Sequence, residues 1–149
     1  MDYEFQAMTK FELEIRYPQH LNASDAEQLG TMTAEDVLSQ FDAVPWRRLQ
    51  MQQLRMEGSS TSLTITGQQP RQSMRLTMNA YTDSDQLEFR MESDIEIVTS
   101  KKDMFGLLNR KIKDYVAFKK LNQDQAREYL KNFVDGQMEL LTQKYQQNK

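Results

Sequence analysis

Hydrophobic and polar residues alternate along the first part of the chain. From Tyr3 to Tyr17 the odd positions are apolar, with Thr9 as the exception, and most even positions are charged or polar. A period of two places one apolar face on a core and one charged face in water. The pattern predicts a long strand of the antiparallel type over residues 3–17, which Pro18 ends.

Residues 19–45 predict two short helices. Ser24 and Thr33 are each followed three positions later by an acidic residue, which is the arrangement of a capping box at a helix start. We expect Gly30 to end the first helix. The second helix carries an apolar stripe and must end before Pro45, because the residue before a proline disfavours helical backbone angles.

Alternation with a period of two returns between Trp46 and Thr99. We interpret this region as four strands that form an antiparallel meander, with a bulge near residues 52–53 of the first strand. The expected turns are at residues 58–60, 67–70 and 83–85. Such a sheet is stable only if another element covers its apolar face.

The C-terminal third of the chain predicts that cover. Apolar residues between 104 and 118 fall on about half of a helical wheel, and four basic residues lie on the opposite side: Lys102, Arg110, Lys113 and Lys120. A second stretch, residues 126–145, repeats the pattern, and Asn122 could cap its start. We expect two helices or one strongly kinked helix over residues 101–146.

Together these elements predict a single α+β domain over residues 1–149. An antiparallel sheet of about five strands, made of the long N-terminal strand and the four-strand meander, packs against C-terminal amphipathic helices. Two short helices follow the first strand. A chain of 149 residues can bury a sizeable core without disulfides or metals.

Charge is unevenly distributed along the chain. The net charge is −3, but residues 1–100 carry −8 and residues 101–149 carry +5. The overall acidity argues against nucleic-acid binding, which needs a concentrated basic surface. The chain has no cysteine, which excludes disulfides, thiolate zinc sites and cysteine nucleophiles. We also expect no signal peptide and no membrane-spanning segment, and therefore a cytoplasmic location.

Catalytic motifs are missing from the sequence. The five glycines stand apart, so none begins a phosphate-binding loop, and no G-x-S-x-G elbow presents a serine. The acidic residues of the predicted strands lie opposite the apolar phase and should face solvent. We expect a surface or capping role for the one histidine, His20. The sequence therefore predicts no catalytic residue, no cofactor and no metal site.

Aromatic residues and methionines are the remaining candidates. Ten methionines could form an adaptable interior, and Trp46, Tyr81 and Tyr115 could place polar tips at the edge of a cavity between sheet and helix. The first hypothesis is a non-catalytic binding module that acts through protein–protein contact or self-association, with Lys102, Arg110, Lys113 and Lys120 as its partner surface. The alternative is a carrier of a small apolar ligand, and an enzyme that uses carboxylates and tyrosines is a third.

Overall fold

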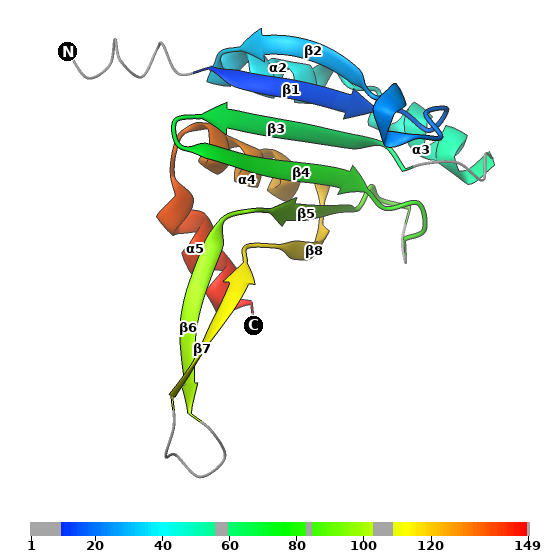
Figure 1. Cartoon of the computed structure of the whole chain (residues 1–149). Helices are drawn as coiled ribbons and strands as arrows, with labels where there is room; N and C mark the ends of the chain where they lie inside the picture. Colours follow the sequence, from blue (N-terminus) through cyan, green and yellow to red (C-terminus); the bar gives the residue numbers. More distant parts are fainter. Residues whose placement is uncertain (1–9, 56–59, 83–84, 103–108, 149) are drawn as a thin grey trace.

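The computed structural model describes residues 10–55, 60–82, 85–102 and 109–148. For residues 99–102 and 109–112 it describes the backbone alone. Six antiparallel strands form the main sheet, in the order β2-β1-β3-β4-β5-β8 (Figure 1). Their bounds are Phe11–Arg16 for β1, Glu27–Met32 for β2, Ser62–Gln68 for β3, Arg71–Met78 for β4, Phe89–Ser93 for β5 and Phe118–Leu121 for β8.

Helices cover one face of this sheet. α4 (Gln123–Val134) lies behind the strands in Figure 1 and contacts α2 (Ala34–Ala43) and α5 (Met138–Gln147). α3 (Trp46–Arg55) lies at the end of the sheet near the close of β4, and a single 3₁₀ turn, η1 (Ala23–Asp25), precedes β2. The predicted α+β fold, with an antiparallel sheet and C-terminal helices packed on it, is confirmed.

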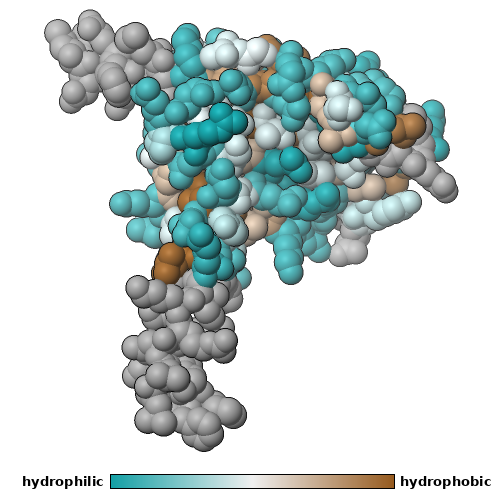
Figure 2. Space-filling view, viewed as in Figure 1, coloured by the Kyte–Doolittle hydropathy of each residue, from teal (hydrophilic) through white to brown (hydrophobic). Residues whose placement is uncertain are grey.

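The core lies between the sheet and the helices. Alternate residues of the strands point toward the helices and are fully or almost fully buried: Phe11, Leu13 and Ile15 of β1, Leu63 and Ile65 of β3, Met74, Leu76 and Met78 of β4, and Phe89 and Met91 of β5. The helices contribute Val37, Phe41, Trp46, Leu130 and Phe133 to the same cluster. The opposite face of the sheet is hydrophilic and faces the viewer in Figure 2.

The remaining two strands form a separate antiparallel hairpin. β6 (Glu96–Lys102) leaves the main sheet after β5, and β7 (Asn109–Tyr115) returns to β8. The hairpin projects well beyond the six-stranded body (Figure 1). We call residues 96–102 and 109–115 the arm.

Part of the predicted first strand is confirmed. β1 begins at Phe11 and ends at Arg16, two residues before Pro18, and its apolar positions are the buried ones. Residues 3–9 of the predicted strand lie outside the described residues. The second predicted helix is also confirmed, because the Thr33 Oγ1 accepts a 3.2 Å hydrogen bond from the Asp36 amide and α2 ends before Pro45.

The first predicted helix is wrong. The 3₁₀ turn η1 is all that forms near Ser24, and the chain then enters β2, which pairs with β1. Leu13 pairs with Gly30 and Glu14 pairs with Gln28, so Leu29 is an extra residue in a β-bulge. Gly30 has a φ of 92°, which a residue without a Cβ adopts at little cost.

The predicted strand with a bulge near residues 52–53 is also wrong, because residues 46–55 form the helix α3. Trp46, Leu49 and Gln53 are buried at helical spacing. Gln53 has its polar atoms satisfied inside: its Oε1 accepts from the Thr61 amide at 2.7 Å, and its Nε2 donates to the Met78 carbonyl at 3.4 Å. The helix thereby joins the ends of β3 and β4.

The largest error concerns residues 101–120, where a helix was expected and the structure has β6, β7 and β8. The second predicted stretch, residues 126–145, is helical, but it forms two helices, α4 and α5. The Asn122 side chain caps α4 by accepting a 2.8 Å hydrogen bond from the Gln125 amide. Gly136, with a φ of 75°, separates α4 from α5. The cover of the sheet therefore consists of α2, α4 and α5, without any helix from residues 101–120.

Candidate functional site

The base of the arm is held to the body by backbone and apolar contacts. The Val116 amide donates a 2.9 Å hydrogen bond to the Ile95 carbonyl, and the Ser93 Oγ donates to the Val116 carbonyl at 2.6 Å. Ile95, Ile97 and Val116 are buried. Because these contacts lie at residues 93–97 and 114–116, the arm has a fixed base.

A side-chain contact from α5 adds to this base. The Tyr145 hydroxyl donates a 2.5 Å hydrogen bond to the Asp114 Oδ2, while the Asp114 Oδ1 accepts from the Tyr115 amide at 2.8 Å. The Tyr145 ring packs edge-on against Phe118, with 6.1 Å between the ring centroids. The end of β7 is thus attached to the C-terminal helix as well as to β6.

The register of the hairpin defines its two faces. Partners across an antiparallel pair lie on the same face, and successive residues alternate. Glu96 pairs with Tyr115 and Val98 with Lys113, so these four residues share one face. Ile97 and Asp114 share the other, which turns toward the body at the base. We call the first the outer face of the arm.

The outer face exposes apolar surface beside charge. Val98 is 57% exposed and Tyr115 is 44% exposed. The Lys113 Nζ lies 3.4 Å from the Glu96 Oε2, in an ion pair that is itself open to solvent. Tyrosine is among the residues that are enriched at protein–protein interfaces.

The half of the arm farther from the body, residues 99–102 and 109–112, is strongly basic. We call it the outer half of the arm. Its described strand residues, 99–102 and 109–112, include Lys101, Lys102, Arg110 and Lys111 and no acidic residue. The backbone register places Lys101 directly opposite Arg110. Like charges at directly opposed positions destabilise a hairpin, and a two-stranded sheet is only marginally stable by itself.

Three of the four predicted partner residues come together in this arm. Lys102 ends β6, and Arg110 and Lys113 belong to β7. Lys120 is separate: it lies on β8, with its Nζ 3.8 Å from the Glu88 Oε1. The sequence interpretation placed these residues on a helix, so it missed Lys101, Lys111 and Val98, which belong to the same arm. The strand register was the signal that would have found them.

The three predicted ligand-binding residues lie in different environments. Trp46 is 2% exposed inside the core, where its Nε1 donates to the Phe41 carbonyl at 3.0 Å and its ring stands edge-on to Phe89 at 5.0 Å. Tyr81 is 83% exposed after β4, and Tyr115 lies on the arm. None of the three lines either of the two grooves described next. A carrier function stays a prediction.

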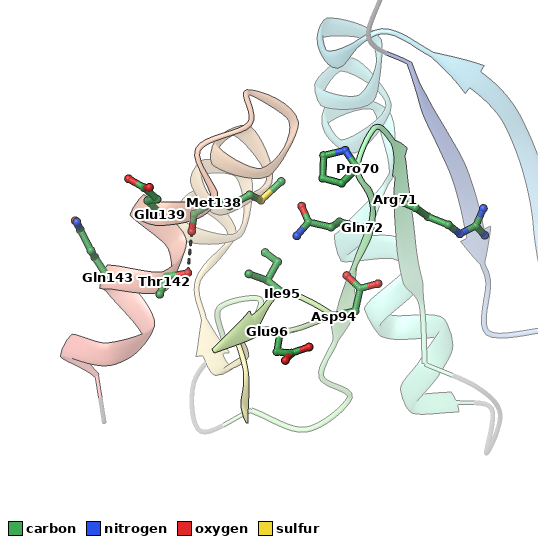
Figure 3. Close-up of a pocket in the computed structure, with 10 residues that line it drawn as sticks. All are labelled: Pro70, Arg71, Gln72, Asp94, Ile95, Glu96, Met138, Glu139, Thr142 and Gln143. Atoms are coloured by element: carbon green, nitrogen blue, oxygen red, sulfur yellow. Dashed lines mark hydrogen bonds between the residues drawn. The ribbon is translucent and has the colours of Figure 1, made fainter. Parts of the chain in front are cut away.

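A groove of about 670 Å³ opens between α5, the β3–β4 turn and the start of β6 (Figure 3). Its acidic residues include Asp94 and Glu96, but both are already engaged. The Asp94 Oδ1 accepts from the Ser73 amide at 2.8 Å, and Glu96 pairs with Lys113. The Arg71 side chain points away from the groove in Figure 3. These contacts are those of a structural junction.

A second groove of about 990 Å³ adjoins the first and shares Pro70, Gln72 and Met138 with it. It lies between the start of α2 and the turn from α4 to α5. Phe11 and Phe133 lie at its floor side by side, with 6.4 Å between their ring centroids, and both are almost fully buried. It exposes amide and carboxylate side chains at its rim, without a matched set of catalytic groups.

His20 has a structural role in the turn after β1. Its Nδ1 accepts a 2.9 Å hydrogen bond from the Tyr17 amide, and its carbonyl accepts from the Arg16 Nε at 3.1 Å. Within the described ranges, no group of three or more histidine, aspartate and glutamate residues is placed to hold a metal ion. No helix among the described residues has the length and apolar character needed to cross a membrane.

Hydrogen bonding and burial shift the pKa of several side chains among the described residues. The Arg127 guanidinium donates two hydrogen bonds to the Asp42 carboxylate, at 2.8 and 3.0 Å, and these bonds lower the pKa of Asp42 and raise the pKa of Arg127. Burial raises the pKa of the Tyr17 and Tyr129 hydroxyls. The Asp42–Arg127 pair joins α2 to α4 and belongs to the scaffold.

Comparison with known proteins adds no functional assignment: no protein-family model, no curated protein and no solved structure matches this chain. The arm is therefore the feature of the described residues from which function is best argued.

Proposed function

We propose that this chain is a non-catalytic, cytoplasmic protein-binding module, and that the arm is its contact surface for an acidic protein partner. The observation that carries the proposal is the composition of the outer half of the arm, which has four basic strand residues and no acidic one. Complementary charge at such a surface speeds encounter and suppresses wrong partners. The absence of cysteine is consistent with a reducing compartment.

The outer face supplies apolar contact as well as charge. Val98 and Tyr115 are exposed on the same face as Lys113. A tyrosine offers a large contact area at a low cost in conformational entropy, and tyrosine is one of the residue types that carry much of the affinity at interfaces. This combination of apolar and charged contacts favours a protein as the partner. A nucleic-acid duplex is less suited, because its phosphate backbone offers charge alone.

The edges of the main sheet are less suited to partner binding. β2 is an edge strand, but the bulge at Leu29 and Gly30 interrupts its regular pairing pattern. β8, at the other edge, has only four residues and carries Lys119 and Lys120. Bulges, short length and lysines are all features that block addition of another strand. Contact through the arm is therefore favoured over strand addition at the body.

The test is direct binding of an acidic peptide. The probe is a fluorescently labelled poly-glutamate peptide, measured by anisotropy at low and at high salt. We expect the unmodified chain to bind and the quadruple variant Lys101→Glu, Lys102→Glu, Arg110→Glu, Lys111→Glu to bind at least about tenfold more weakly, a change of about 1.4 kcal/mol. High salt should weaken binding of the peptide to the unmodified chain.

A matched control separates the arm from net charge. The variant Lys10→Glu, Arg48→Glu, Arg71→Glu, Lys119→Glu changes the net charge equally, at four exposed residues of the body. It should keep affinity for the peptide near that of the unmodified chain. Equal loss in both variants, or tighter binding to a DNA duplex than to the peptide, would overturn the proposal.

A further inference from the structure

We infer that the acidic surface to which the arm binds is present on this same chain, and that a second copy is the partner. This inference rests on the proposed function of the arm. Residues 10–45, which form β1, β2 and α2, contain two basic and seven acidic residues. Six of these acidic residues form no ion pair within the described part of the chain: Glu12, Glu14, Asp25, Glu27, Glu35 and Asp36. We call residues 10–45 the acidic end.

The arm and the acidic end lie at opposite ends of the molecule (Figure 1). β1 and β2 form one edge of the main sheet, and the arm projects from beyond β5 and β8 at the other edge. The fixed base of the arm, with Tyr145 bonded to Asp114, holds it in this direction. An arm therefore cannot reach the acidic end of its own chain, and the contact must form between two copies.

Charge supports a contact between copies in two ways. The four basic residues in the outer half of the arm are opposite in charge to residues 10–45, which carry a net charge of −5. In addition, the whole chain carries only −3, so that general repulsion between copies is weak. Separated charges of opposite sign on a nearly neutral molecule favour encounter of unlike ends.

The geometry of this contact sets the type of assembly. The arm of one copy contacts a different surface on the next, so the interface is heterologous rather than two-fold symmetric. A pair of bound copies still presents one free arm, on one copy, and one free acidic end, on the other. The assembly grows into an open chain or closes into a ring, and it does not stop at a dimer unless two copies close on each other.

A charge-swap experiment tests the inference by sedimentation velocity at low salt over a wide range of concentration. The arm variant is Lys101→Glu, Lys102→Glu, Arg110→Glu, Lys111→Glu, and the end variant is Glu12→Lys, Glu27→Lys, Glu35→Lys. Circular dichroism establishes that each variant is folded. We expect the unmodified chain to assemble reversibly and high salt to dissociate it. Each variant alone should associate at least about tenfold more weakly.

Mixing the two variants provides the decisive observation. The acidic arm of one variant then faces the basic end of the other, so assembly should return in the mixture. A monomeric unmodified chain at low salt, or a mixture that does not assemble, would overturn the inference. Either result leaves binding of the poly-glutamate peptide to the arm unaffected, so failure here is distinct from failure of the proposed function.

Discussion

The hydroxyl of Tyr145, near the end of α5, donates its hydrogen bond to the carboxylate of Asp114, near the end of β7. This bond connects the C-terminal helix to the base of the arm, between residues 31 positions apart in the sequence. The arm makes most of its other contacts within itself. The orientation of the proposed contact surface therefore depends on a small number of bonds at its base.

Removal of this bond should loosen the arm without unfolding the body. In Tyr145→Phe the ring can still pack against Phe118, but the Asp114 Oδ2 loses its partner from α5. We expect amide hydrogen exchange in β6 and β7 to become about tenfold faster, equivalent to about 1.4 kcal/mol of local stability. Tyr129→Phe is the control, because Tyr129 packs on the same Phe118 ring from α4. Equal exchange rates in both variants would show that the bond does not hold the arm.

The Asp42–Arg127 pair predicts a pH dependence of stability. The folded state lowers the pKa of Asp42, because Arg127 stabilises the ionised carboxylate. The contribution of the pair is therefore complete above the unfolded-state pKa of about 3.9 and is lost as the pH falls through the lower folded-state pKa. Both side chains are partly open to solvent, so at neutral pH Asp42→Asn should cost only about 0.2–1 kcal/mol.

Urea unfolding at neutral pH and near pH 2 measures this difference. The double variant Asp42→Asn, Arg127→Gln controls for changes unrelated to the pair. In the double-mutant cycle the coupling energy should be smaller near pH 2 than at neutral pH. A coupling energy that is unchanged at low pH would contradict the assigned cause of the pKa shift.

Elements that bury one face could be predicted from the sequence. β1, β3 and β4 lie over the core, and each shows the alternation of apolar and polar residues that one-sided burial imposes. Hydroxyl and amide caps were equally informative: Thr33 and Asn122 begin α2 and α4 as expected. These signals are local, because the residues that carry them are close in sequence.

The arm could not be predicted by the same reasoning. The strand sequence around Lys101 and Arg110 shows no alternation of apolar and polar residues. β2 was not predicted either, because its residues are almost all exposed. Periodicity reports burial, so a strand without a buried face does not produce the pattern. Of the candidate site, the basic residue types were found, but their arrangement was not.

α3 was missed because buried polar residues conceal its helical spacing. Gln50 and Gln53 are buried together with Trp46 and Leu49. The contacts of Gln53 with Thr61 and Met78 are known only from the structure. From the sequence alone a glutamine is expected at the surface. The apolar residues that remain, at positions 49, 51, 54 and 56, resemble two phases of a strand.

Trp46 and Tyr81 should respond to substitution in opposite ways. Trp46 packs against Phe41 and Phe89 in the core, so Trp46→Ala should cost about 3–5 kcal/mol and leave the domain at best marginally stable. Tyr81→Ala should change stability by less than about 0.5 kcal/mol, since the side chain is 83% exposed. Thermal unfolding followed by circular dichroism measures both. A small effect at Trp46 would indicate a loose pocket there, as the carrier hypothesis requires.

Gly30 should be the position of β2 that is most sensitive to substitution. Its φ of 92° lies in the left-handed region, and the space around a Cβ added there is open to 4 Å. The cost of Gly30→Ala is therefore a backbone cost, which we expect to be about 1–2 kcal/mol.

A graded series at this position distinguishes backbone strain from loss of contacts. Gly30→Asn should cost less than Gly30→Ala, because asparagine tolerates the left-handed region better, and Gly30→Val should cost more. Thr31→Ala, at the neighbouring exposed residue, is the control and should cost only a few tenths of a kcal/mol. Urea unfolding gives the four free energies. If all three Gly30 variants were as stable as the unmodified chain, the bulge would not depend on a positive φ, and the argument that it protects the β2 edge from strand addition would lose its basis.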